Sequence, residues 1–102
     1  MKTNSITKYR FINQLQNLPF VEQILLFGSR ARGDNSERTD IDLAILCPSA
    51  NDSDWLQVTE IIDNADTLLK IDCIRLDSLP LDSPLLANII RDKAELYAKN
   101  KT

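Results

Sequence analysis

The sequence predicts an α+β fold with α/β character, in which helices pack on one face of a small mixed β-sheet of three to four strands. Two observations predict this class. Segments in which apolar residues recur at helical spacing alternate along the chain with short apolar runs typical of buried strands. The 102 residues, 43% of them hydrophobic, match the size of one domain with one core, so we expect residues 1–102 to form a single domain.

The first half of the chain predicts one helix and two strands. Apolar residues recur at helical spacing in residues 5–15, and Ser5 is available there as an N-cap. Residues 21–27 form an apolar run that ends at a glycine, which indicates a largely buried strand. The polar residues 28–39 contain both glycines of the chain and predict a turn followed by a short helical segment and a loop. Residues 41–46 are apolar again and predict the second strand.

The second half predicts a helix, a third strand and a closing helix. The helix expected from Asp54 has one apolar face, with Ser53 or Asp52 as its N-cap. The third strand is expected at residues 69–76. After a segment with two prolines, apolar residues at helical spacing predict a last helix over residues 86–97.

Composition excludes several classes of function. The formal net charge of −3 argues against a nucleic-acid binder, because such proteins usually present clustered Lys and Arg side chains. The chain has no histidine, so any acid–base or metal chemistry must use carboxylates. No apolar run approaches the ~20 residues that cross a bilayer, and the polar start has no signal-peptide core. We expect a cytoplasmic protein without direct nucleic-acid or membrane contacts, in which Cys47 and Cys73 are structural.

A turn suited to phosphate follows the first strand. Gly28-Ser29 leaves a buried apolar run and offers backbone N–H groups and a hydroxyl. Only glycine lets a phosphate approach the backbone this closely. Alone the pair is weak evidence, because a glycine and a serine after a strand most often only make a turn.

Two aspartates open the second strand. The side chains of residues 40–43 alternate, so Asp40 and Asp42 share one face, with Cα atoms roughly 7 Å apart, while Ile41 faces the core. Mg²⁺ prefers one or two carboxylates together with water and substrate phosphates. Because aspartate is depleted in strands, a pair at alternate positions favours a metal site over a solvated strand start.

A third carboxylate, Asp72, lies in the predicted third strand. An unpaired charge is costly there if it is buried without a partner or a metal ion. If the third strand lies beside the second, Asp72 would help to hold the metal or take the proton from a reacting hydroxyl. The alternative is an edge-strand aspartate that faces water. Asp77, at the exit of the strand, is a poorer candidate.

Together these residues resemble the DNA polymerase β-like nucleotidyltransferase superfamily, whose pattern is a Gly-Ser turn, a gap of about this length and a strand-borne Asp-x-Asp. Residues 28–33 (GSRARG) and 39–45 (TDIDLAI) are similar to the minimal nucleotidyltransferase (MNT) family, which includes antitoxins paired with HEPN-domain toxins. The resemblance extends over nearly the whole chain, and its specific residues lie between Phe27 and Leu46. Thr39 stands where serine is commoner, which is a conservative departure.

The resemblance implies a nucleotidyltransferase fold and a Mg²⁺-dependent enzyme with ATP as donor, in-line attack at the α-phosphorus and release of pyrophosphate. The residues so assigned are Gly28, Ser29, Arg30 and Arg32 for nucleotide binding, and Asp40, Asp42 and Asp72 as metal ligands and catalytic groups. The two arginines would support the phosphates by charge-assisted hydrogen bonds, although loop arginines that contact solvent or a partner surface are an equal alternative.

The acceptor is open to three hypotheses, because the sequence has no evident acceptor pocket and a partner must supply it. By resemblance, the chain binds a HEPN ribonuclease toxin from the adjacent gene and transfers AMP onto a tyrosine hydroxyl of that toxin. Alternatively, the same site modifies a small molecule that a partner subunit presents. A third hypothesis is a non-catalytic antitoxin that acts by binding alone, and the retention of all three aspartates argues against it.

Overall fold

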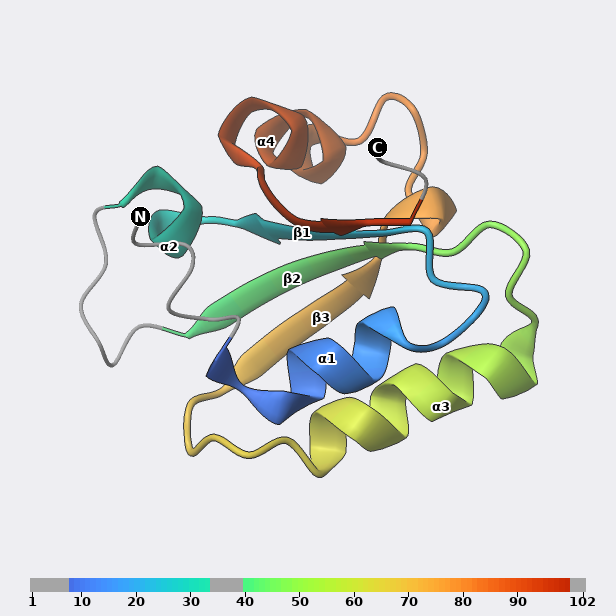
Figure 1. Cartoon of the computed structure of the whole chain (residues 1–102). Coiled ribbons are helices and arrows are strands. Elements are labelled where there is room, and N and C mark those ends of the chain that lie inside the picture. Colours follow the sequence, from blue (N-terminus) through green and yellow to red (C-terminus); the bar gives the residue numbers. More distant parts are fainter. Residues whose placement is uncertain (1–7, 34–39, 100–102) are drawn as a thin grey trace.

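The structure is a computed structural model that describes residues 8–33 and 40–99. Helices and strands alternate along the chain (Figure 1). The elements are α1 (Arg10–Gln16), β1 (Gln23–Phe27), α2 (Ser29–Arg32), β2 (Ile41–Leu46), α3 (Asp52–Asp63), β3 (Ile71–Arg75), the 3-10 helix η2 (Leu76–Ser78), α4 (Pro84–Asp92) and β4 (Ala94–Ala98). Within this described part of the chain, no helix is long and apolar enough to cross a membrane.

The four strands form one mixed sheet in the order β3-β2-β1-β4. β1 runs antiparallel to both β2 and β4, whereas β2 and β3 are parallel. A parallel pair needs a crossover connection, and α3 supplies it. The α+β class with a small mixed sheet is therefore confirmed.

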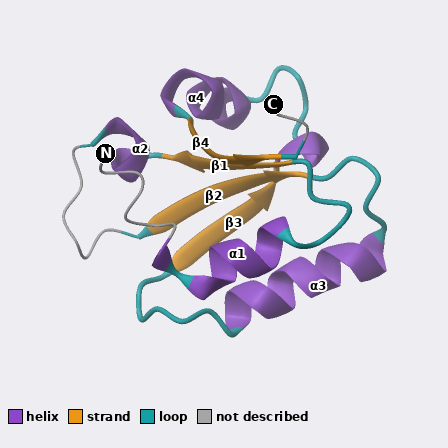
Figure 2. Cartoon of the chain, viewed as in Figure 1, coloured by secondary structure: helices purple, strands orange, loops and turns teal. Residues whose placement is uncertain are grey.

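Helices cover both faces of the sheet (Figure 2). α1 and α3 lie on one face, where Leu15 and Val58 belong to the main buried core. α4 lies on the other face, where Ile89 packs with Leu25 of β1 and Ala44 of β2. The sequence predicted helices on one face only. A helix packs on the second face as well, because the central strands carry apolar side chains on both faces of the sheet.

The last element of the described residues is a strand, so the predicted helix over residues 86–97 is wrong in its second half. α4 begins after Ser83, whose hydroxyl accepts a backbone hydrogen bond in the first turn, and it ends at Asp92. Lys93 has an extended backbone (φ −56°, ψ 144°), after which Ala94–Ala98 pairs with β1. The spacing of apolar residues in this segment fits either a helix or a strand. The strand forms because β1 would otherwise be an apolar sheet edge.

The helix starts differ in detail from the prediction. α3 is capped by Asn51 and not by Ser53 or Asp52. Oδ1 of Asn51 accepts the N–H of Asp54 (2.8 Å), and Oδ2 of Asp54 accepts the N–H of Asn51 (3.1 Å), which is a capping box. The predicted N-cap Ser5 of the first helix lies outside the described residues.

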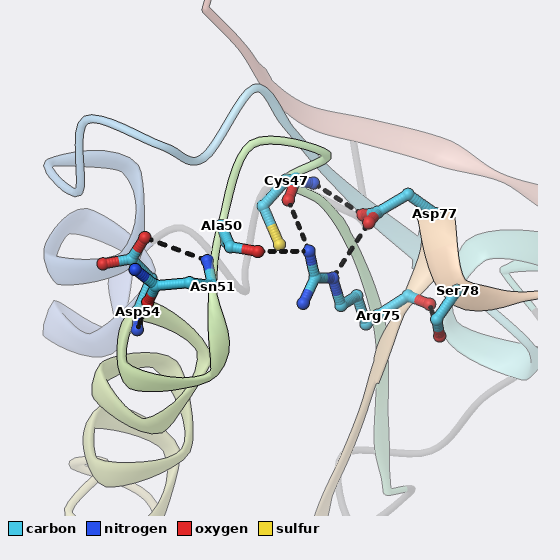
Figure 3. Close-up of polar contacts among 7 residues, drawn as sticks. All are labelled: Cys47, Ala50, Asn51, Asp54, Arg75, Asp77 and Ser78. Carbon is cyan, nitrogen blue, oxygen red and sulfur yellow. Dashed lines mark hydrogen bonds and ion pairs between the residues drawn. The ribbon is translucent and has the colours of Figure 1, made fainter.

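Arg75 and Asp77 fasten the loop that follows β2 (Figure 3). Nη2 of Arg75 donates to the carbonyl oxygens of Cys47 (3.0 Å) and Ala50 (2.7 Å), and its Nε donates to Oδ2 of Asp77 (2.9 Å). Oδ1 of Asp77 accepts the N–H of Cys47 (2.8 Å). Burial raises the pKa of the Asp77 carboxyl, but these hydrogen bonds and the Arg75 charge outweigh it and hold that pKa below its usual value. Asp77 therefore stabilises the loop at the end of β2.

Candidate active site

The strand register brings the predicted site residues to one corner of the sheet. β1 ends at Phe27, which pairs with Asp42 near the start of β2. On its other side Asp42 pairs with Asp72 near the start of β3. Because β1 is antiparallel to β2 and β2 is parallel to β3, the end of β1 meets the starts of β2 and β3. The turn that follows β1 and the aspartates that open β2 and β3 therefore lie at the same edge.

Gly28 makes a close contact with Asp42. Its backbone lies at φ 74° and ψ −156°, a region that only glycine occupies readily. A Cβ atom added at Gly28 would lie 2.5 Å from Oδ2 of Asp42. The missing side chain thus allows the backbone of the turn to reach the carboxylate, which a larger residue would prevent.

The short helix α2 follows this contact directly. Ser29 is its first residue, and Gly33 at φ 83° closes it. The N–H groups of Ala31 and Arg32 donate to the carbonyl oxygen of Gly28 (3.1 and 3.2 Å). A helix start leaves N–H groups without acceptors inside the helix, and such groups favour an anion. The local geometry at Gly28 and Ser29 is compatible with a phosphate-binding turn.

Asp42 and Asp72 form a pair of repelling carboxylates. Burial raises the pKa of the Asp42 carboxyl above its usual value, and the negative charges of Asp72 and Asp40 raise it further. Lys70 opposes this shift. Its Nζ lies 3.7 Å from Oδ1 of Asp72, but its side chain is 70% exposed, so water screens the pair. A bound cation would relieve the repulsion between these carboxylates.

The donors at this corner fit Mg²⁺ bound together with a substrate. Asp40 is exposed and stands immediately before β2. In residues 8–33 and 40–99, no group of three or more carboxylates or thiols is arranged to hold a metal ion by itself. Mg²⁺ does not require such a cage, because it keeps several waters and binds through one or two carboxylates plus substrate phosphates. Asp42 and Asp72 are register partners at this corner and would be such a pair.

The two arginines of α2 have different surroundings in the structure. Arg30 is buried, with 7% of its surface exposed. Nη1 of Arg32 lies 3.1 Å from Oδ2 of Asp92, the last residue of α4. Sequence reasoning missed Asp92, because it predicted a helix that continues past this residue, and because the partner lies 60 positions away. A carboxylate at the C-terminal end of a helix is electrostatically unfavourable, which is the signal that would have identified it once the helix end was known.

This fold and this corner define a nucleotidyltransferase. A family described as polymerase beta, nucleotidyltransferase matches residues 10–102, which is nearly the whole chain. The chain therefore belongs to the polymerase beta nucleotidyltransferase family, and its class of activity is nucleotidyl transfer. Comparison with curated proteins gives no match.

Similar folds occur in solved structures of nucleotidyltransferases and toxin–antitoxin complexes. A toxin–antitoxin structure with AMP-PNP is 23% identical (TM-score 0.58) over 98% of this chain and 76% of that chain. A putative nucleotidyltransferase from Sulfolobus solfataricus is 20% identical (TM-score 0.60) over 97% and 83%. A structure of tri-AMPylated Shewanella oneidensis HEPN toxin in complex with MNT antitoxin is 22% identical (TM-score 0.56) over 96% and 71%. At these identities the likeness shows a shared fold.

Proposed function

We propose that the protein is a Mg²⁺-dependent nucleotidyltransferase that transfers AMP from ATP to a tyrosine hydroxyl of a HEPN-domain ribonuclease toxin, and so acts as an antitoxin. The observation that carries this proposal is the contact between Gly28 and the Asp42 carboxylate, with Asp72 as the register partner of Asp42. Backbone groups suited to phosphate and carboxylates suited to a cation thus meet at one edge of the sheet.

The triphosphate of ATP would bind at Gly28 and Ser29. Gly28 has no side chain to block the turn and tolerates the positive φ there, and Ser29 adds a hydroxyl that can donate to phosphate oxygens. Arg30 and Arg32 belong to the same four-residue helix and bring positive charge to this edge. That charge offsets the repulsion between phosphates and the nearby aspartates.

Asp42 and Asp72 would hold Mg²⁺, and Asp40 would add negative charge beside them. When bound, the ion neutralises charge on the phosphates and helps to orient the α-phosphorus. The raised pKa of Asp42 reflects the cost of holding carboxylates together. Sites that bind charged ligands often keep such unfavourable groupings, because the ligand compensates for them.

In the transfer step, the acceptor oxygen forms a bond to the α-phosphorus while the bond from that phosphorus to the bridging oxygen of the β-phosphate breaks. Pyrophosphate leaves. The proton of the acceptor hydroxyl passes to a carboxylate, and Asp72 is the candidate because its side chain is 47% exposed and accessible to an incoming group. Gly28 and Ser29 hold the leaving phosphates in line with the attack.

Two structural relatives support a protein acceptor. One is a toxin–antitoxin structure with AMP-PNP, and the other contains a tri-AMPylated HEPN toxin in complex with MNT antitoxin. An AMPylated toxin is the product that this chemistry would give. The net charge of −3 disfavours a nucleic-acid acceptor, whose phosphates an acidic protein repels. The partner would be the HEPN-domain product of the adjacent gene.

The experiment combines the protein with Mg²⁺, each nucleoside triphosphate in turn and the product of the adjacent gene, and measures both proteins by mass spectrometry. We expect an AMP adduct on a tyrosine of the partner with ATP as donor. Asp42→Asn should abolish the adduct, since it keeps the shape of the side chain and removes its charge. Asp82→Asn, which removes the same charge from an exposed position in the loop before α4, should retain it.

Each alternative acceptor gives a different result in the same assay. Absence of both adduct and pyrophosphate with the wild-type protein, although the two proteins associate, would contradict the proposal and favour an antitoxin that acts by binding. Pyrophosphate release that depends on an added small molecule, without a protein adduct, would favour a nucleotidyltransferase subunit that modifies a molecule presented by its partner. Pyrophosphate release together with the tyrosine adduct supports the proposal.

A further inference from the structure

α2 carries the proposed nucleotide-binding residues but has little support of its own. It has four residues, whereas isolated helices shorter than ~12–15 residues are already marginal in water. It lies against β1, and Ala31 packs at the margin of the main core. The position of α2 therefore depends on its tertiary contacts.

Asp92 connects the end of α2 to α4. Its Oδ2 accepts hydrogen bonds from Nη1 of Arg32 (3.1 Å) and Nη2 of Arg91 (3.1 Å), and its Oδ1 accepts one from Nε of Arg91 (3.0 Å). The Asp92 side chain is only 10% exposed, whereas those of Arg32 and Arg91 are 45% and 67% exposed. Hydrogen bonds from Arg91 and then Arg32 hold the pKa of Asp92 below its usual value, so the carboxylate stays charged at neutral pH.

α4 holds Asp92 at a fixed position relative to the sheet. A carboxylate at the C-terminal end of a helix is opposed by the helix dipole, and here two guanidinium groups compensate for that. α4 is anchored by the fully buried Ile89, which packs with Leu25 and Ala44 of the central strands. A group one turn from Ile89 is therefore held in place relative to β1 and β2.

We propose that Asp92 is a positioning residue of the nucleotide site: through Arg32 it fixes α2 against α4, so that Ser29 and Arg32 are in place before the triphosphate binds. This inference deepens the proposed function and rests on it. A binding element that is ordered in advance loses less conformational entropy when its ligand arrives, and affinity rises accordingly. Asp92 touches neither the substrate nor the metal site in this scheme.

The test measures AMP-PNP binding with Mg²⁺ by titration calorimetry in the full chain. Asp92→Asn should weaken binding about five- to tenfold, which corresponds to about 1.0–1.4 kcal/mol. Asp92→Glu, which keeps the charge, should recover most of the affinity. Two controls should remain within about twofold of wild type. Arg91→Gln leaves the contact between Asp92 and Arg32, and Asp82→Asn removes an aspartate from an exposed loop.

Two further measurements separate positioning from a general loss of stability. Hydrogen exchange without nucleotide should become faster at the amides of residues 29–33 in Asp92→Asn and stay unchanged in Arg91→Gln. In the double variant with Arg32→Gln, Asp92→Asn should weaken binding no further than Arg32→Gln alone, because the two residues act through one contact.

Either of two results would contradict this inference and leave the proposed function standing. One is unchanged affinity and unchanged hydrogen exchange in Asp92→Asn, and the other is an equal loss of affinity in Asp92→Asn and Arg91→Gln. Failure of the wild-type protein to bind AMP-PNP would instead refute the proposed function, and the inference with it.

Discussion

The carboxylate of Asp42 occupies the space that a side chain at Gly28 would need, since a Cβ atom there would lie 2.5 Å from Oδ2. Gly28 follows β1 and Asp42 belongs to β2, so the contact joins the turn to the acidic strand. The positive φ of Gly28 and this close approach act together, because either alone disfavours any other residue. The contact can be tested without knowledge of the acceptor.

Gly28→Ala should abolish AMP-PNP binding and lower the free energy of unfolding by about 2–4 kcal/mol, because backbone strain adds to a clash with Asp42. Gly33→Ala is a matched control, since Gly33 also has a positive φ (83°) but a Cβ there has nothing within 4 Å. It should lose only about 1–2 kcal/mol and keep its affinity. Urea denaturation and calorimetry measure both quantities. Equal effects in the two variants would show that the contact between Gly28 and Asp42 does not matter.

Asp42→Asn should stabilise the metal-free protein at neutral pH. Burial, and then the charges of Asp72 and Asp40, raise the pKa of Asp42 in the folded state. A raised carboxyl pKa means that its contribution to stability is full below the unfolded pKa of about 3.9 and is lost as the pH rises through the folded pKa. The neutral amide avoids this loss. We therefore expect the melting temperature at pH 7 to rise by roughly 2–5 °C.

The same variant should lose Mg²⁺-dependent AMP-PNP binding, so stability and function change in opposite directions. At pH 3.5 the difference in melting temperature between Asp42→Asn and wild type should nearly vanish, because the wild-type carboxyl is then protonated. Asp82→Asn controls for the change in net charge and should leave the melting temperature at pH 7 unchanged. A lower melting temperature for Asp42→Asn at pH 7 would mean that the carboxylate stabilises the fold. That would contradict the destabilising effect expected from its burial and the nearby negative charges.

The residues at this corner of the sheet could be predicted from the sequence, because each part is defined by a short segment of the chain. Alternation along residues 41–46 places Asp42 opposite to the core-facing Ile41, and both are found so. Pairing of consecutive strands then brings the end of β1 beside Asp42. The residue types in these segments indicate their chemistry before any coordinates are known, and the roles of Asp40, Asp42 and Asp72 stay predictions.

The C-terminal region was less accessible because its structure depends on distant partners. The apolar spacing of residues 86–97 suits a helix, but Ala94–Ala98 pairs with β1, and the register partners Gln23 and Ala98 lie far apart in the sequence. The helix therefore ends at Asp92, whose contact with Arg32 also joins distant segments. Local propensity contains no information about either pairing, so the fourth strand and the Asp92 contact required coordinates.

Asp77→Ala should destabilise the protein at neutral pH without impairing nucleotide binding. It leaves the N–H of Cys47 and Nε of Arg75 without their acceptor, which costs about 1–3 kcal/mol. Burial raises the pKa of Asp77, but the bonds from Cys47 and Arg75 lower it below its usual value. A lowered carboxyl pKa stabilises the fold above the unfolded pKa, and this contribution is lost as the pH falls through the folded pKa.

The urea denaturation midpoints of Asp77→Ala and wild type should therefore converge on acidification from pH 7 to pH 3. Asp82→Ala is the control for removal of an exposed carboxylate and should show neither effect. Loss of AMP-PNP affinity in Asp77→Ala at a temperature where it is folded would contradict a purely structural role for this residue.

Ile89→Ala tests whether α4 covers the second face of the sheet. Ile89 is fully buried and packs with Leu25 and Ala44, so its truncation leaves a cavity and should cost about 2–4 kcal/mol. Its neighbour Ile90 is 57% exposed, and Ile90→Ala should stay within about 0.5 kcal/mol of wild type. Chemical denaturation of both variants gives the comparison. If Ile90→Ala were the more destabilising change, α4 would be turned the other way on the sheet, and Asp92, one turn from Ile89, could not hold Arg32 as described.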